Sequence, residues 1–336
     1  MIFKHLMDVT FPARDQSLAR VVADLSEADA GRSADNLITN EDSIGRVADR
    51  LESGDDVYLG VGPDQNFSFI ARTRPRLSFV LDFRRRNALL HLMHKALFAL
   101  GPDRAGYLER LLARRPRKLP VNPSSDDLIA GFEGVTMDRD RLGSTIAEVA
   151  SYLRPLGVVA EEEWPEIATI QAKLAGPGLN ARFLALPMYP TLARLIRSKD
   201  RLGHPSHFLA REDWFQVVRA AEMGDRVIPI VGDFAGSKAL ASLADWLRQR
   251  GLRISTFYAS DVEFFLLRSG KFPAYIANLA RLPWSERAVL IRTSTREILH
   301  PERAPGDSST TILRPVAPFL EAAMLGRIGT LEDLFL

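Results

Sequence analysis

Two kinds of apolar pattern alternate along this chain. Continuous apolar runs, typical of strands buried on both faces, occupy residues 57–61, 77–83, 226–234, 253–260 and 287–294. Apolar positions at helical spacing lie between them, at 66–71, 87–100, 237–251 and from Val262 onward. Strands that alternate with helices in this way predict an α/β fold with a doubly wound, mostly parallel, Rossmann-like sheet.

Three further stretches lie outside this alternation. Apolar residues at helical spacing around Val21 and Val47 predict an N-terminal helical cap at 1–55, with one helix within 12–30 and a second starting near Asn40. Residues 101–224 carry only helical periodicity, interrupted by Pro- and Gly-containing turns, and are expected to form a helical insertion or lid. The core is then divided into 56–100 and 225–336. In the second part, GDSSTT near Asp307 is expected to be an exposed loop before a final helix at about 318–325.

Composition narrows the classes of protein. The 336 residues are 46% hydrophobic, which is enough to bury a large core. Lys+Arg 44 against Asp+Glu 42 gives a formal charge of only +2, which disfavours a nucleic-acid partner. The absence of cysteine excludes disulfides, thiolate metal sites and cysteine nucleophiles. No apolar run has signal-peptide or membrane-span length, so we expect a cytoplasmic protein with a small-molecule substrate and no membrane partner. The oligomeric state is not indicated.

Polar residues follow each predicted strand, and in a parallel sheet these ends form the ligand-binding edge. The first strand ends in Gly60-Val61-Gly62-Pro63, where missing β-carbons let a ligand approach the backbone and the next helix offers N–H groups. The second strand ends at Asp82, about 20 residues later, the spacing of an acid that binds ribose hydroxyls. The third ends in Asp233-Phe234, suited to an adenine amine and ring.

The fourth strand end offers the candidate catalytic groups. Tyr258, Asp261 and Glu263 are placed to orient a substrate or to act as a base. Structural alternatives stay open for the acids: Asp82 as a helix cap or a partner of one of the arginines at 84–86, and Asp233 and Asp261 as helix caps. The glycine pair has a plain turn as its alternative, because Gln65 stands where a dinucleotide motif needs its third glycine.

The remaining motifs give weaker evidence for a functional site. His91 and His94 are spaced as a metal pair, but on an apolar helix with no partner nearby in sequence they are expected in the core or on the surface, so no metal site is predicted. Neither a P-loop nor a Gly-x-Ser-x-Gly elbow is present. The arginine-rich stretches 72–76, 84–86 and 114–118 are expected to be solvated, unless two of them converge on a cleft and favour an anionic substrate.

Taken in order, Gly60 to Gly62, Asp82 and Gly232-Asp233-Phe234 resemble the class I S-adenosylmethionine-dependent methyltransferase fold. More specifically, the stretches NLITNE, GVGPDQNFSFI, DFRRRN, HLMHKALF, GDFAGSKAL and FYASDVEFFL resemble a bacterial family of uncharacterised proteins with that methyltransferase-like core. The resemblance to the methyltransferase fold covers roughly residues 40–100 and 225–295.

The resemblance implies a cofactor, S-adenosylmethionine, and a set of residues around it. Gly60 and Gly62 would meet its methionine part, Asp82 its ribose, and Asp233 with Phe234 its adenine. Three residues of the N-terminal segment would fold over the site: Asn36, Asn40 and Glu41. The implied set also includes the neighbours of the glycine turn, Pro63, Gln65 and Asn66, and the neighbour of Asp82, Arg84.

Two functional hypotheses follow from the sequence. The first is a methyltransferase-like protein that binds S-adenosylmethionine and methylates a small or anionic substrate. The alternative is a non-enzymatic protein that binds a nucleoside or an anionic effector, favoured because Tyr58 stands where methyltransferases carry the acid of their first motif. A nicotinamide-dependent oxidoreductase ranks below both because the glycine pattern is incomplete.

Overall fold

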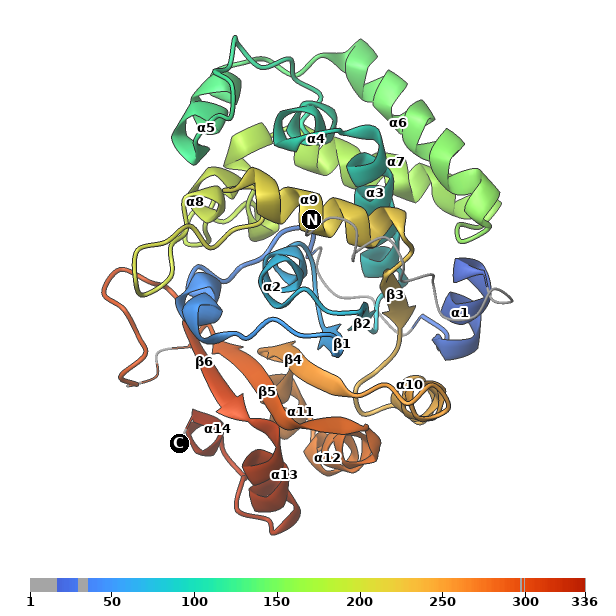
Figure 1. Cartoon of the computed structure of the whole chain (residues 1–336), viewed down its shortest axis with the longest axis vertical. Coiled ribbons are helices and arrows are strands. Elements are labelled where there is room, and N and C mark those ends of the chain that lie inside the picture. Colours follow the sequence, from blue (N-terminus) through green and yellow to red (C-terminus); the bar gives the residue numbers. More distant parts are fainter. Residues whose placement is uncertain (1–16, 30–35, 297, 299, 336) are drawn as a thin grey trace.

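A six-stranded sheet forms the centre of the computed structural model, which describes residues 17–29, 36–296, 298 and 300–335 (Figure 1). The parts of the predicted N-terminal cap at 1–16 and 30–35 lie outside the described residues. The sheet order is β3-β2-β1-β4-β5-β6, in which only β6 is antiparallel to its neighbour. The strands are β1 (Val57–Gly60), β2 (Leu77–Asp82), β3 (Val227–Val231), β4 (Ile254–Ser260), β5 (Trp284–Ser294) and β6 (Thr310–Pro315).

Helices cover both faces of this sheet, so its inner strands are buried throughout and read as continuous apolar runs. On one face α2 (Gln65–Thr73) and α3 (Arg85–Leu100) pack against β1, β2 and β3. On the other face lie α1 (Leu18–Leu25), α10 (Ala239–Arg248), α11 (Val262–Arg268), α12 (Phe272–Arg281) and α13 (Val316–Met324) (Figure 1). The predicted α/β fold with a mostly parallel sheet is confirmed.

Residues between α3 and β3 form helices that cover the outer side of α2 and α3. Helix α9 contacts both α2 and α3, and α4, α6 and α7 contact α3. The helices of this segment are α4 (Arg104–Leu111), α5 (Ser125–Phe132), α6 (Arg139–Leu153), α7 (Trp164–Ala175), α8 (Leu192–Ile196) and α9 (Glu212–Met223). Short 3-10 turns occur at Arg154–Leu156, Glu161–Glu163, Gly178–Asn180 and Phe183–Ala185.

The strand β6 corrects the expectation of an exposed loop. Thr310 and Thr311, the last residues of the GDSSTT stretch, are fully buried and begin the strand that closes the sheet beside β5. The hydroxyl of Thr311 lies 2.7 Å from that of Ser43 and 2.9 Å from that of Thr293. The stretch looks polar in sequence, but the Thr311 hydroxyl is satisfied by other hydroxyls inside the protein. The chain after β6 continues as α13 and α14 (Leu331–Phe335).

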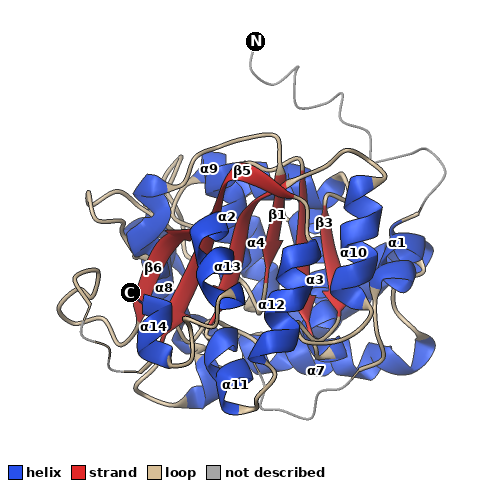
Figure 2. Ribbon diagram, turned by 90° about the horizontal axis from the view of Figure 1, so that it is seen from below, coloured by secondary structure: helices blue, strands red, loops and turns tan. Residues whose placement is uncertain are grey.

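The order of the strands fixes where the chain changes direction across the sheet. From β1 the chain moves outward to β2 and β3, and it then returns to the other side of β1 with β4 and β5. The gap between the carboxyl ends of β1 and β4 is therefore the switch point, where open α/β sheets bind their ligands. In Figure 2 the parallel strands run downward, so this edge faces the lower part of the view, where α11 lies. Among the described residues, no helix has both the length and the apolar character needed to cross a membrane.

A buried ion pair joins α11 to β5. Arg292 donates to the Glu263 carboxylate at 2.5 Å and 2.9 Å, and the Tyr275 hydroxyl donates to it at 3.1 Å. Both charged side chains are almost wholly buried. The Arg292 guanidinium also lies 4.5 Å from the centre of the Phe319 ring, on α13. Glu263, a candidate catalytic residue in the sequence, is therefore held inside the protein by this pair.

We expect Glu263→Gln to lower the free energy of unfolding by about 3 kcal/mol, because it leaves a buried guanidinium without its counter-ion. Urea unfolding followed by circular dichroism measures this change. The matched control is Glu286→Gln, an exposed glutamate on β5, which is expected to change stability by less than about 0.5 kcal/mol. Equal effects of the two substitutions would contradict the structural role of the pair.

Candidate functional site

The segment Asn36–Glu41 lies across the carboxyl ends of β1 and β4. The backbone N–H of Thr39 donates to Asp64 at 2.9 Å, which attaches the segment to the start of α2. Two residues later, Glu41 is fully buried and receives the Tyr258 hydroxyl at 2.6 Å. The segment therefore reaches the switch point, and the expectation that Glu41 folds over the strand ends agrees with its position. Asn40 is half-buried between these contacts.

Glu41 is the centre of a cluster of hydroxyl groups at this edge. The hydroxyls of Tyr258 and Ser260, at the end of β4, donate to its carboxyl group, and the Thr293 hydroxyl on β5 acts to lower its pKa. Gln65 extends the cluster to α2, because its amide donates to the Tyr258 hydroxyl at 3.0 Å. The structure thus brings together three residues predicted separately from the sequence: Glu41, Gln65 and Tyr258.

Burial sets the proton affinity of this cluster. Burial, with a smaller repulsion from the Asp261 carboxylate, raises the pKa of Glu41 from 4.5 to about 7, although the hydroxyl bonds act in the opposite direction. Burial likewise raises the pKa of Asp261, while the positive charges of Arg84 and Arg296 oppose that rise. A carboxyl group with a pKa near neutrality can both accept and release a proton at physiological pH, as a general acid or base requires. Asp261 begins α11 as expected, but its side chain makes no capping bond.

Ser260 occupies a strained backbone position beside Glu41. Its φ angle of 54° lies in the left-handed region, which costs a non-glycine residue roughly 1 kcal/mol or more. The register between β4 and β5 also shifts between Tyr258 and Ser260. Irregularities of this kind turn side chains out of the strand pattern, and they are frequent next to functional sites. Here the turn directs the Ser260 hydroxyl to Glu41.

The glycine turn after β1 is filled by the protein's own side chains. The Asn66 amide donates to the carbonyls of Val61, Gly62 and Pro63 at 2.7–3.1 Å, and its oxygen accepts the Tyr58 hydroxyl at 2.8 Å. A β-carbon at position 60 would lie 2.0 Å from that same Asn66 oxygen. Gly60 is therefore needed to make room for Asn66, which is the turn alternative of the sequence analysis.

Gly62 has a different environment. Its φ angle of 77° requires glycine, and the Nε2 of His91 lies 2.9 Å from its carbonyl oxygen. Since a carbonyl only accepts hydrogen bonds, His91 donates this bond as a neutral imidazole. Burial lowers the His91 pKa to about 4, which agrees with that state.

Two amide oxygens near this turn are unsatisfied. The Oδ1 of Asn36 and the Oε1 of Gln65 are buried and have no hydrogen-bond partner among the described residues. The amides of both residues lie within 4 Å of the place where a β-carbon of Gly62 would stand. Buried polar atoms without partners are uncommon in folded proteins and often mark the position of a ligand or water. The turn therefore presents acceptors to a hydrogen-bond donor.

The two acids at the neighbouring strand ends are already paired. Arg84 holds Asp82 with bonds of 2.8 and 2.7 Å to its two oxygens. Asp233 accepts Lys271 at 3.0 Å and the N–H of Ala235 at 2.9 Å. For Asp82 this is the pairing alternative considered from the sequence.

Phe234 and the start of α10 are also occupied by the protein itself. Phe234 is buried, 5.6 Å from the Phe257 ring, so it contributes to the core. The Glu27 carboxylate accepts the N–H groups of Lys238 and Ala239 at 2.9 and 2.6 Å, and of Asp233 at 3.2 Å. Glu27 therefore takes the capping role that the sequence suggested for Asp233.

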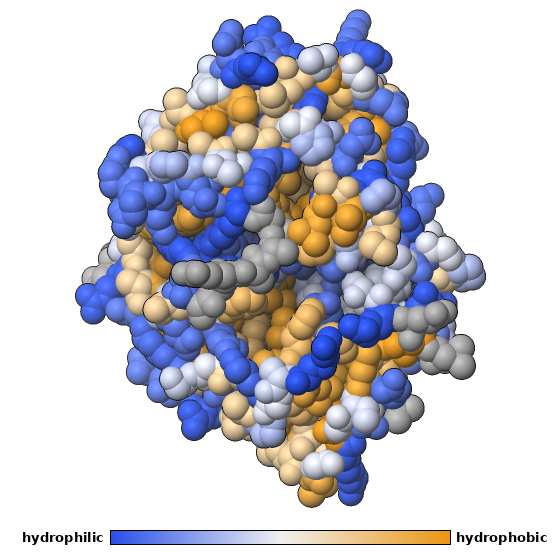
Figure 3. Space-filling view, turned by 180° about the vertical axis from the view of Figure 1, so that it is seen from behind, coloured by the Kyte–Doolittle hydropathy of each residue, from blue (hydrophilic) through white to orange (hydrophobic). Residues whose placement is uncertain are grey.

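A cavity of about 390 Å³ adjoins the covering segment on its outer side. Leu37 and Ile38 form one wall, and the chain from Lys173 to Ala185 forms the rest, including the cations Lys173 and Arg182. The rear face of the molecule, on which the strand ends open, is hollowed near its centre, with apolar side chains in its depth (Figure 3). The cavity gives a small molecule room beside the strand ends.

A smaller apolar pocket shares Leu37 and Ile38 with this cavity and contains Asp64, His94 and Tyr107. The Tyr107 hydroxyl lies 2.8 Å from His94, and burial raises the pKa of Asp64 to about 6. Sequence reasoning missed Asp64 as a site residue, although its place at the start of α2 is a signal for a polar contact. The other missed residue, Thr293, gave no signal within its strand.

A family model described as "Domain of unknown function (DUF7790)" matches residues 37–119 and 179–319 of the chain. The match includes the covering segment from Leu37, the glycine turn and the ends of β2, β3 and β4. The unmatched residues 120–178 contain α5, α6 and α7 of the helical insertion. No curated protein matches the chain.

The raised pKa of Glu41 predicts how stability depends on pH. Between pH 4.5 and 7 the unfolded chain has lost the Glu41 proton while the folded chain keeps it, so stability falls as the pH rises through this window. The loss attributable to Glu41 is on the order of 2 to 3 kcal/mol between pH 5 and pH 8. We expect Glu41→Gln to abolish that share of the pH dependence. Other buried acids, such as Asp64, contribute equally to both proteins and cancel.

Urea unfolding at pH 5 and pH 8 measures the effect in the wild type, in Glu41→Gln and in the control Glu286→Gln. The control should keep the full loss of the wild type. If Glu41→Gln loses as much stability as the control, the carboxyl group does not titrate as the structure indicates.

Proposed function

We propose that this chain, which belongs to the DUF7790 family, binds S-adenosylmethionine at the carboxyl edge of its sheet and acts as a methyltransferase-like protein. One observation carries the proposal: Glu41, Gln65 and Tyr258 meet at the switch point between β1 and β4. Ligands of open α/β sheets bind at this position. The proposal agrees with the resemblance of the strand ends to class I methyltransferases.

The methionine end of the cofactor fits the residues at the glycine turn. The free oxygens of Asn36 and Gln65 need hydrogen-bond donors, and an ammonium group offers three. The carboxyl group of Asp64, whose pKa burial raises to about 6, adds negative charge in the same region at neutral pH. A ligand that brings an amino group and a positive sulfonium to this turn would satisfy atoms that the protein leaves without partners.

The adenosine end fits less well. Both oxygens of Asp82 are bound to Arg84, and Phe234 is buried in the core. Only the Asp233–Lys271 pair is substantially exposed, with 30% and 56% of its side chains accessible. The Asp82–Arg84 pair would have to open before Asp82 bound a ribose, so we derive no catalytic step from contacts to the adenosine.

The chain itself supplies a base and a place for a substrate. A bound cofactor would contribute an electrophilic methyl group, and transfer then depends mainly on holding the acceptor in line. Glu41 is the group suited to take the acceptor's proton, because its pKa lies near 7 and Tyr258 and Ser260 hold its carboxyl group in place. The cavity beside Leu37 suits a small substrate, and Lys173 and Arg182 in its wall favour an anionic one.

A second candidate is supported by the paired acids. Because Arg84 already neutralises Asp82, the edge as folded suits a protein that binds a nucleoside or an anionic effector without transferring a group. Tyr58 in the place of the first-motif acid agrees with this, since its hydroxyl serves the internal bond to Asn66.

Calorimetry with S-adenosylmethionine and with its demethylated product tests the binding proposal. The wild type should bind both. Asn36→Ala should weaken binding about tenfold, since it removes an acceptor of a charge-assisted hydrogen bond. Asn122→Ala, an exposed asparagine in the helical insertion, is the matched control and should bind as the wild type does. Absence of binding of both compounds to the wild type would remove the cofactor from the proposal.

A second experiment separates the two candidates. The wild type is incubated with methyl-labelled cofactor and a broad extract of small metabolites, and labelled products are sought by mass spectrometry. A methyltransferase yields a labelled product, and Glu41→Gln should reduce its rate about 100-fold while leaving cofactor binding within a few fold. Binding without any labelled product would select the non-enzymatic alternative.

A further inference from the structure

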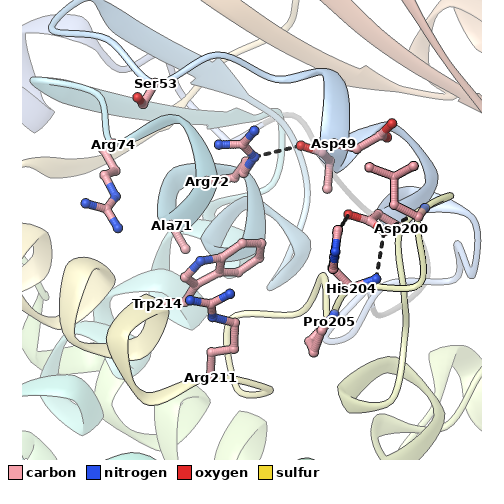
Figure 4. A pocket seen from close by; sticks show the side chains of 12 residues that line it. Asp49, Ser53, Ala71, Arg72, Arg74, Asp200, His204, Pro205, Arg211 and Trp214 are labelled. Atoms are coloured by element: carbon pink, nitrogen blue, oxygen red, sulfur yellow. Dashed lines mark hydrogen bonds and ion pairs between the residues drawn. The ribbon is translucent and has the colours of Figure 1, made fainter.

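A second cavity, of about 500 Å³, lies beside the C-terminal end of α2, away from the strand-end site at the beginning of that helix. Figure 4 shows the side chains that line it. Helix α2 connects the two regions, because it begins at Gln65 beside the strand ends and its last turn, with Arg72, lines this cavity. The other walls come from the 3-10 helix η2 (Ile44–Arg50) with the residues after it, the loop 200–205, and the start of α9. Four segments far apart in sequence therefore meet here.

Three arginines line this cavity: Arg72, Arg74 and Arg211. The Nε of Arg72 donates to the Ala48 carbonyl at 2.8 Å, which fixes the side chain while its terminal nitrogens stay available. Arg74 is exposed, in a left-handed backbone position with a φ angle of 51°, and its side chain has no hydrogen-bond or ion-pair partner among the described residues. Arg211 pairs with Asp213 on the surface.

The two acids in the cavity wall do not neutralise these arginines. Asp200 accepts the N–H groups of Leu202 and His204 at 2.9 and 2.8 Å and so organises its own loop. One oxygen of Asp49 binds Arg201 at 3.1 Å. The other, Oδ1, is buried without a hydrogen-bond partner among the residues described, on a side chain that is only 8% exposed. Positive charge therefore remains uncompensated, next to one acceptor that lacks a donor.

Trp214 gives the cavity an aromatic surface. The residue is half-buried at the start of α9, and the Arg211 guanidinium lies 5.7 Å from the centre of its ring. Figure 4 shows Trp214 between Arg72 and Arg211, with Arg74 to one side. A flat ring flanked by guanidinium groups suits the stacking of a planar base beside a bound phosphate.

From these contacts we propose that this cavity binds a mononucleotide. Arg72 and Arg74 bind the phosphate, and Trp214 stacks on the base. A volume of about 500 Å³ lies within the range of small-molecule sites. The two arginines belong to the stretch 72–76, which was expected from the sequence to be solvated. The site differs from the strand-end site in its residues, its charge and its end of α2.

Calorimetry with adenosine 5′-monophosphate tests the site, with ribose 5-phosphate and inorganic phosphate as partial ligands. The intact chain should bind the mononucleotide about tenfold more tightly than ribose 5-phosphate, because stacking of the base on Trp214 contributes about 1.4 kcal/mol, which is tenfold in affinity. Arg74→Ala should weaken binding about tenfold or more, since it removes a charge-assisted bond to phosphate. Arg74 has no partner to lose, so its replacement should leave the fold intact.

The matched control is Arg76→Ala, an exposed arginine two residues further along that does not line the cavity. It removes the same charge and should leave the affinity unchanged. Glu41→Gln should also leave it unchanged, which separates this site from the strand-end site whatever becomes of the methyltransferase proposal.

Three results would overturn the proposal: no binding of the mononucleotide, equal weakening by Arg74→Ala and Arg76→Ala, or equal affinity for ribose 5-phosphate. The second result would mean that the ligand responds only to the total positive charge of this surface. The third would mean that the base makes no favourable contact with Trp214.

Discussion

The buried carboxyl group of Glu41 is the contact on which the arrangement of the strand ends depends. A carboxyl group removed from water is costly unless hydrogen bonds compensate, and here the hydroxyls of Tyr258 and Ser260 at the end of β4 do so. Those bonds hold the segment Asn36–Glu41 across the sheet, and the segment in turn places Asn36 at the glycine turn and Leu37 at the cavity wall. Because burial raises the pKa of this carboxyl group more than the hydroxyl bonds lower it, the pKa lies close to neutrality. The burial of the Glu41 carboxyl group therefore determines both the position of this segment and the pKa of the group itself.

The sheet edge also shows how the chain satisfies its own polar groups. Asn66 bonds to three carbonyls of the turn, and Arg84 and Lys271 pair with the acids at the ends of β2 and β3. A parallel sheet covered on both faces leaves its polar groups at the strand ends, where each needs a partner. Most find one within the protein. Among the described residues, Asn36 Oδ1, Gln65 Oε1 and His91 Nδ1 near the glycine turn have none, and they support the case for a ligand there.

How much could be predicted from sequence depended on whether the partners of a residue lay close to it along the chain. The strands β1 to β5 were predictable because burial on both faces makes each one a continuous apolar run. The Asp82–Arg84 pair, two residues apart, was a stated alternative. By contrast, the buried pair of Glu263 with Arg292 was not predicted because the two residues are 29 positions apart, and β6 was missed because its buried Thr311 bonds to Ser43, 268 positions away. The cavity at Arg72 and Arg74 likewise depends on residues of the distant loop 200–205 and of α9.

Helix α2 connects the strand-end site with the cavity lined by Arg72. In both regions some polar side-chain atoms have no partner among the described residues. The nine residues of α2 span about 14 Å, from Gln65 at the strand-end site to the cavity lined by Arg72. The positive end of the helix dipole faces the acids at the carboxyl edge, and Arg72 lies at the negative end, so both ends carry charges that favour this orientation. Between them Phe67 and Phe69 are buried, and α9 packs over the helix. A well-packed helix moves as a unit or not at all, so the core that fixes α2 determines the geometry of both candidate sites together.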